Sequence, residues 1–149
     1  MYRILMAIDE DQRQANEIAA SVEKLADNID DLEILVLHVF RDVELPSQVV
    51  IHEQLVDFEE IQHEQREIPA AVTDVVKQLG GRDIDAEIII ERSEDPPSKI
   101  ISVAEEHDVD NIFIGGRTSS PIGKAMFGNV SQKVLLNTDI PVTVATVPS

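Results

Sequence analysis

The sequence predicts an α/β fold: a doubly wound, five-stranded parallel sheet with helices on both faces. Short apolar runs of strand length alternate along the chain with longer segments in which apolar residues recur at helical spacing. Such alternation favours parallel strands joined by right-handed helical crossovers. The chain has 149 residues, of which 43% are hydrophobic, so we expect one domain, 1–149, with a buried core.

The first strand and helix are indicated by an apolar run and a capping motif. Ile4 to Ile8 are continuously apolar, and the run ends at Asp9. Asp11, with Gln14 three residues later, resembles a capping box and indicates a helix start. The helix that follows carries an apolar stripe that predicts its buried face, made of Ala15, Ile18, Ala19, Val22, Leu25 and Ala26.

The second strand is predicted at Leu32 to Phe40, which is apolar except for Glu33 and His38. Such a run is typical of a central parallel strand that is covered on both faces. His38 is either a hydrogen-bonded core residue or a ligand-binding residue, and we expect the first.

The segment from Val50 to Ile68 is expected to form an amphipathic helix that either covers the sheet or contacts a partner. Glu60 and His63 have a spacing that is found in carboxylate-bridged metal sites. Such sites need further ligands on facing helices, so we expect a solvated acidic face and no metal. The apolar residues near helical spacing are Ile51, Leu55, Phe58 and Ile61.

A further helix and an edge strand are predicted next. Pro69 is favoured at a first helical position, and Gly80 and Gly81 are expected to close the helix. Ile84 to Glu91 largely alternates apolar and acidic residues, which indicates an edge strand with one wetter side.

The last helices and strands are predicted from capping residues, prolines and apolar runs. Asp95 is expected to cap a helix that begins at one of the two following prolines. The fourth strand is predicted at Asn111 to Gly115, the last helix at about Asn129 to Leu136, and the last strand at Val142 to Val147.

The composition excludes several classes of function. The chain has 12 Lys and Arg against 29 Asp and Glu, and its net charge of -17 repels nucleic acid and anionic membrane surfaces. Cysteine is absent, so disulfides and thiolate metal sites are excluded. The first apolar run is too short for a signal peptide or membrane span, so we expect a cytoplasmic protein. The acid excess resembles that of proteins from salt-adapted organisms; an ordinary acidic bacterial protein is the alternative.

One segment departs from this acidity. Asn111 to Thr138 contains no acid and carries Arg117, Lys124 and Lys133. Its pattern is that of a strand, a glycine loop and a helix N-terminus, which together direct backbone N–H groups and a helix dipole at a phosphate. We therefore expect this segment to favour anions.

The fold predicts where a ligand would bind. In doubly wound sheets, ligands lie at the carboxyl ends of the strands, at the topological switch point. Asp9, Val39 and Gly115 are all strand-end residues. If the first and fourth strands are adjacent, Asp9 and the Gly115 loop face each other across that crevice.

These residues resemble the universal stress protein superfamily over nearly the whole chain. The matching segments are Ile4-Leu5-Met6-Ala7-Ile8-Asp9, Leu37-His38-Val39 and Pro141-Val142-Thr143-Val144. The resemblance implies a sheet ordered 3-2-1-4-5, and many members bind ATP. Nucleotide-binding members carry G-x2-G-x9-G-[ST] after the fourth strand. The corresponding residues here are Gly115, Thr118, Gly128 and Asn129, of which Thr118 and Asn129 depart from the pattern.

The resemblance implies a role for each strand-end residue. Asp9 would lie near the adenosine and accept from a ribose hydroxyl or the adenine amino group; alternatively, it only stabilises the helix start. Val39 would meet the adenine through its backbone, or would be a strand-end core residue. Gly115 and Gly128 would permit close backbone approach to the phosphates, or would be turn glycines alone.

The resemblance also places four neighbours of the glycines at the phosphates. Arg117 would neutralise phosphate charge, or would be simply solvated. Asn129, a good N-cap that can donate through its amide, would open the last helix beside Val130. If position 118 needs a positive φ or a close backbone approach, Thr118 would remove phosphate contacts and weaken ATP binding.

We therefore expect a cytoplasmic universal stress protein that binds ATP or a related adenine nucleotide, with or without Mg²⁺, as a regulatory ligand in stress response. The alternative is a non-nucleotide-binding, dimeric interaction protein of the same fold. Enzymatic activity would be at most slow ATP hydrolysis or autophosphorylation, because no general base or metal-ligand cluster is evident beside the loop.

The last strand predicts how the protein assembles. In the implied order it is an edge, and Val142 to Val147 is apolar and uncharged, which invites pairing with another chain. We expect a symmetric homodimer in which the two last strands pair antiparallel, as in many relatives.

Overall fold

The computed structural model describes residues 1–41, 68–119, 124–126 and 128–148. The segment predicted at Val50 to Ile68, with Glu60 and His63, lies outside the described residues except for Ile68. The elements are β1 (Tyr2–Ala7), α1 (Gln12–Ala26), β2 (Leu32–Arg41), α4 (Ala70–Gly80), β3 (Ala86–Ser93), α5 (Pro96–Glu106), β4 (Asn111–Ser119), β5 (Lys124–Met126), α6 (Asn129–Asn137) and β6 (Val142–Pro148).

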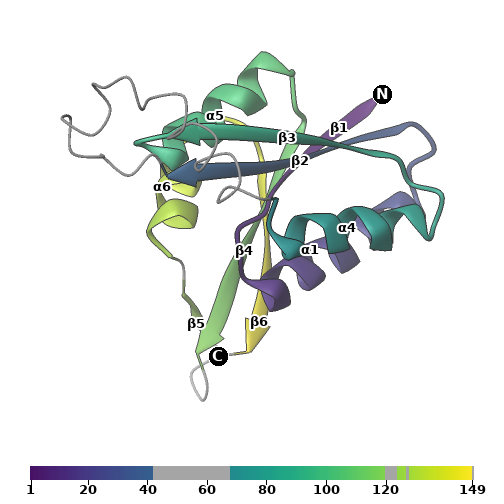
Figure 1. The fold of residues 1–149 in the computed structure, drawn as a ribbon, viewed down its shortest axis with the longest axis horizontal. Helices are drawn as coiled ribbons and strands as arrows, with labels where there is room; N and C mark the ends of the chain where they lie inside the picture. The colour runs from purple at the N-terminus through teal and green to yellow at the C-terminus, as the bar shows by residue number, and fades with distance from the viewer. Residues whose placement is uncertain (42–67, 120–123, 127, 149) are drawn as a thin grey trace, which may run out of the picture.

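Five parallel strands lie in the order β3-β2-β1-β4-β6 (Figure 1). In chain order these are the predicted strands 3-2-1-4-5, so the predicted fold class and strand order are confirmed. β3 lies at one edge, as its alternating sequence predicted. Central β1 pairs along its whole length with β2, and through Ile4, Leu5 and Met6 with the start of β4.

β4 is longer than predicted. We expected it to end at Gly115, but it continues to Ser119 because β6 stays paired with it as far as Thr118 opposite Pro148. Beyond the end of β1, the short strand β5 pairs antiparallel with β4, Arg117 lying opposite Met126. Figure 1 shows β4 and β6 side by side with β5 next to the end of β4. The sequence did not predict β5.

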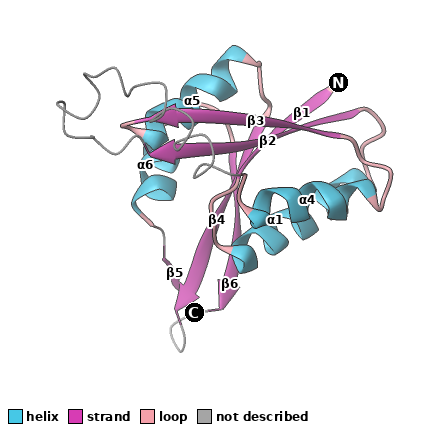
Figure 2. Ribbon diagram, in the orientation of Figure 1, coloured by secondary structure: helices cyan, strands magenta, loops and turns pink. Residues whose placement is uncertain are grey.

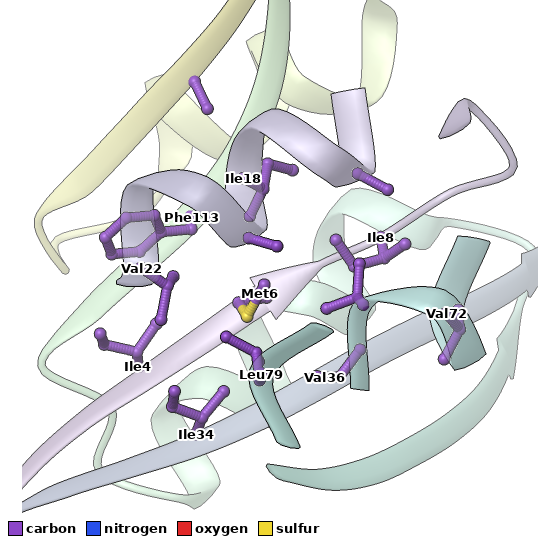
Figure 3. Packing of buried hydrophobic residues seen from close by; sticks show 14 of the residues in the cluster. Ile4, Met6, Ile8, Ile18, Val22, Ile34, Val36, Val72, Leu79 and Phe113 are labelled. Atoms are coloured by element: carbon purple, nitrogen blue, oxygen red, sulfur yellow. The ribbon is translucent and has the colours of Figure 1, made fainter. Parts of the chain in front are cut away.

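The helices form two layers. α1 and α4 lie side by side on one face of the sheet, whereas α5 and α6 pack together on the other (Figure 2). Successive strand residues point to opposite faces, so β1 sends Ile4 and Met6 to the first layer and Leu5 to the second. Figure 3 shows the first layer, in which Ile18 and Val22 of α1 pack with the strand side chains.

The helix starts follow local chemistry. Asp11 caps α1, as predicted, and its side chain accepts from the backbone N–H groups of Arg13 and Gln14. Pro69 was predicted as the first helical residue, but it is the N-cap of α4, and the helix begins one residue later at Ala70. Asp95 precedes α5 and accepts from the hydroxyl of Ser98 at 2.6 Å.

Candidate functional site

A pocket of about 210 Å³ opens at the carboxyl ends of β1, β2 and β4. Its position is the topological switch point, where the chain leaves β1 toward α1 and leaves β4 on the other side. Four of the predicted site residues line this pocket, which the fold assembles from four separate segments. They are Asp9, Val39, Gly115 and Val130.

Asp9 lies two residues after the end of β1 and is exposed. Its Oδ1 accepts from the backbone N–H of Asp11 at 2.8 Å, so the carboxylate supports the start of α1. The same side chain lines the pocket, and a carboxylate has further acceptor capacity beyond one hydrogen bond. The two interpretations of Asp9 are therefore compatible.

Val39 and Val130 line the pocket from a strand and a helix, respectively. Val39 lies on β2 and Val130 in the first turn of α6, and both side chains pack against the α5 and α6 core. Val39 thus packs against the core, as one of the two interpretations expected. Because Val39 also lines the pocket, the contact between its backbone and an adenine remains a prediction.

Gly115 is buried within β4 rather than in a loop. A Cβ added there would lie 3.0 Å from Cβ and Cδ of Gln14 and would overlap its Oε1, so any larger residue at this position would have to displace the Gln14 side chain. The carbonyl of Gly115 accepts from the hydroxyl of Ser131 on α6 at 3.0 Å. Gln14 and Ser131 also line the pocket, and neither was predicted from the sequence as a site residue.

Gly128 has different surroundings. It is the exposed N-cap of α6, with φ −68°, and a Cβ added there would meet no atom within 4 Å. The expected N-cap, Asn129, is instead the first residue of the helix. The first turn of α6 contains no acid, and its first N–H groups have no acceptor within the helix. This end of α6 therefore favours an anion, as predicted.

Arg117 and Thr118 lie in β4, where their backbones pair with both β5 and β6. A positive φ at Thr118 is one condition under which the sequence predicts weakened binding, but the strand places this residue in an extended conformation, which a β-branched residue favours. The proposed steric reason for weakened phosphate binding at Thr118 does not apply to this geometry.

Two further pocket residues come from β2. His38 is only 5% exposed, and its Nδ1 lies 2.7 Å from the carbonyl oxygen of Ile8, so it is the hydrogen-bonded core residue that the sequence predicted. Arg41, exposed at the end of β2, lines the pocket as well. Its position directly after an apolar run was the signal that could have identified it as a strand-end residue.

The comparison with protein families decides the classification of the chain. Residues 1–146 match the model of the universal stress protein family.

The chain belongs to the universal stress protein family.

Solved structures of this family share the fold. A universal stress protein from Archaeoglobus fulgidus has 22% sequence identity and a TM-score of 0.68, with 97% of this chain and 98% of that chain covered. A family protein from Arabidopsis thaliana with AMP bound has 15% identity and a TM-score of 0.61, covering 98% and 92%. A universal stress protein in complex with cAMP has 11% identity and a TM-score of 0.61, covering 97% and 96%.

A comparison with curated proteins found no match. Among the helices of the described residues, none combines the length and apolar character that a membrane crossing requires. Within the same residues, no group of three or more His, Cys, Asp or Glu could hold a metal ion.

Proposed function

We propose that this universal stress protein binds an adenine nucleotide, such as ATP, as a regulatory ligand in stress response. The observation that supports the proposal best is the pocket at the switch point, which joins Asp9 and Val39 to the N-terminus of α6. Two relatives of the same fold were solved with AMP and cAMP, so the fold accommodates this class of ligand.

The size of the pocket suggests which part of the nucleotide it would enclose. Its volume of about 210 Å³ is below the range of about 300–1,000 Å³ that is typical of sites enclosing a whole drug-sized ligand. The nucleoside would therefore occupy the pocket, while the phosphates would extend to the exposed start of α6. Gly128 leaves open space there. Any Mg²⁺ would be held mainly by the phosphates, since no carboxylate cluster is present among the described residues.

The proposal is tested with the purified protein. ATP, AMP and cAMP should each be titrated by calorimetry, with and without Mg²⁺, and thermal unfolding should be followed in parallel. A ligand that binds only the folded state raises the unfolding midpoint. Protein that is denatured directly after purification from cells should release an adenine nucleotide. A flat titration with every nucleotide, and no released nucleotide, would contradict the proposal.

A second proposal concerns assembly. We propose that two copies form a homodimer by antiparallel pairing of their β6 strands. In the described residues, β6 pairs with β4 along one side, and no described strand pairs with its other side. An apolar, uncharged edge of this kind favours pairing with another chain. The dimer is compatible with nucleotide binding, and it is also the basis of the alternative function as an interaction protein.

A further inference from the structure

We propose that Nε2 of His38 accepts a hydrogen bond from the bound nucleoside, either from the adenine amino group or from a ribose hydroxyl. The inference rests on the proposed function and adds a residue that determines which nucleoside the pocket accepts. It follows from three properties of His38: the position of its proton, the fixed orientation of its ring, and the absence of a partner for Nε2 among the residues that the structure describes.

The proton of the neutral ring is on Nδ1. Nδ1 lies 2.7 Å from the carbonyl oxygen of Ile8, and a carbonyl oxygen can only accept a hydrogen bond. Nδ1 must therefore donate. In a neutral imidazole, the other nitrogen then carries the lone pair, so Nε2 is a hydrogen-bond acceptor.

The ring is held in one orientation. His38 is 5% exposed, and its ring packs edge-on against Phe40, with ring centroids 4.6 Å apart and an interplanar angle of 84°. Ile8 is tied to β2 as well, because its N–H donates to the carbonyl of Leu37 at 2.9 Å. An acceptor that is fixed in this way loses little conformational entropy when a ligand binds.

Within residues 1–41, 68–119, 124–126 and 128–148, Nε2 has no hydrogen-bond partner. The hydrogen bond to Ile8 is the one that His38 makes among the described residues. His38 lines the pocket, and Nε2 is the ring nitrogen that the Ile8 carbonyl does not engage, so we assign Nε2 to the ligand.

The pocket thus presents two kinds of acceptor, the Asp9 carboxylate and the His38 imidazole. Adenosine offers matching donors in its amino group and its ribose hydroxyls, whereas a 6-oxo purine presents an acceptor where adenine has its amino group. A buried acceptor that faces another acceptor is unsatisfied. We expect the nucleotide that lacks the required donor to bind about 10- to 100-fold more weakly than ATP.

The test is ¹⁵N NMR of histidine-labelled protein at about pH 8, where histidine side chains are ordinarily neutral. The chain has four histidines, and the variant His38→Asn assigns the His38 signals by removing them. Without ligand, Nδ1 should be protonated and Nε2 should have the shift of an unprotonated nitrogen. Saturating ATP should then shift the Nε2 signal in the direction of a hydrogen-bonded acceptor.

Two analogues identify the donor. If the adenine amino group donates, inosine triphosphate should leave the Nε2 signal unchanged and bind weakly. If a ribose hydroxyl donates, 2′-deoxy-ATP or 3′-deoxy-ATP should leave the Nε2 signal unchanged and bind weakly. In calorimetry, His38→Asn should lose most of the discrimination between ATP and that analogue, while its amide N–H can still reach the Ile8 carbonyl and preserve the fold.

Each outcome is decisive. A ligand-free protein protonated at Nε2, or an Nε2 signal that saturating ATP does not move, would overturn the inference while the proposed function stands. If no nucleotide binds to the wild-type protein, the proposed function fails and the ligand role of His38 fails with it.

Discussion

Gly115 and Gly128 both belong to the family's glycine motif, yet they are glycines for different physical reasons. Gly115 is buried, and the side chain of Gln14 lies across its α-carbon. Gly128 is exposed, has a negative φ and has no atom near the position of a Cβ. Packing within the protein thus accounts for the first glycine. The second is free of such constraints, which is consistent with close approach of a ligand.

Gly115→Ala should destabilise the protein by about 1 kcal/mol, because the added methyl group must displace the half-buried side chain of Gln14. Urea denaturation measures the change. The double variant Gly115→Ala with Gln14→Ala should recover most of the loss, since the two substitutions act on one contact. Equal destabilisation in the single and double variants would show that Gln14 is not the obstacle.

Gly128→Val should leave the protein folded but abolish ATP binding in calorimetry. A β-branched side chain would occupy the open space at the start of α6 and keep phosphates away from its N–H groups. Loss of a favourable N-cap residue should cost only about 1 kcal/mol of stability. Gly128→Ser, which retains N-cap function in a smaller side chain, is the matched control. Unchanged ATP affinity in the valine variant would show that the phosphates do not bind at the start of α6.

At the scale of elements, the extension of β4 changes the interpretation of the predicted phosphate loop. Gly115 to Ser119 continue as a strand because β6 pairs with them on one side and β5 on the other. The N-terminus of α6 thus remains as the predicted anion-binding element with unpaired backbone N–H groups. Residues 120–123 and 127 of the loop lie outside the described part of the chain.

Thr118→Gly tests this extension. In a strand, glycine is less favourable than a β-branched residue by about 1 kcal/mol, so the variant should be less stable by about that amount. The sequence alone predicted that glycine would tighten ATP binding by removing a strained residue. With Thr118 in an extended strand, we expect no gain in affinity by calorimetry. Tenfold tighter binding would show that position 118 leaves the strand when ATP binds.

A charged substitution in β6 tests whether this edge strand forms the proposed dimer. In Thr146→Lys, the side chain lies in the middle of the last strand, and lysine on an edge strand opposes pairing with another chain. Light scattering at micromolar concentration should change from a dimer in the wild type to a monomer in the variant. Thr146→Ser should remain dimeric. A monomeric wild-type protein in near-molar salt would refute the dimer.

At the scale of the whole molecule, the net charge of -17 at pH 7 dominates the electrostatics. Ion pairs between the described residues lie mostly at the surface, such as Lys99 with Glu91 at 3.7 Å, whereas Arg82 pairs at 2.9 Å with the half-buried Glu23. Surface pairs contribute little individually, so they do not offset the repulsion among the excess acids. The molecule should therefore depend on dissolved ions for part of its stability.

The unfolding midpoint should rise between low salt and molar KCl, because dissolved ions screen repulsion within the folded chain. Each kcal/mol of repulsion that is relieved should raise the midpoint by about 2–4 °C. Calorimetric scans in a KCl series, with matched sucrose solutions as a control for general exclusion effects, measure this. A flat or falling midpoint would remove the salt-adapted interpretation.

The sequence by itself determined the fold class, the order of the parallel strands through the family resemblance, and most element bounds. These properties depend on periodicity and on residues such as Asp11 and Pro69, whose effects are local. It also identified the strand ends at which the pocket opens, because ligands of this architecture bind there.

Only the tertiary structure decided which side chains meet at those ends. The bonds from Ser131 to the Gly115 carbonyl and from His38 to the Ile8 carbonyl join residues 16 and 30 positions apart. The length of β4 likewise depends on its pairing with β6 and β5. Contacts of this kind arise from strand register and helix packing, which no local pattern encodes.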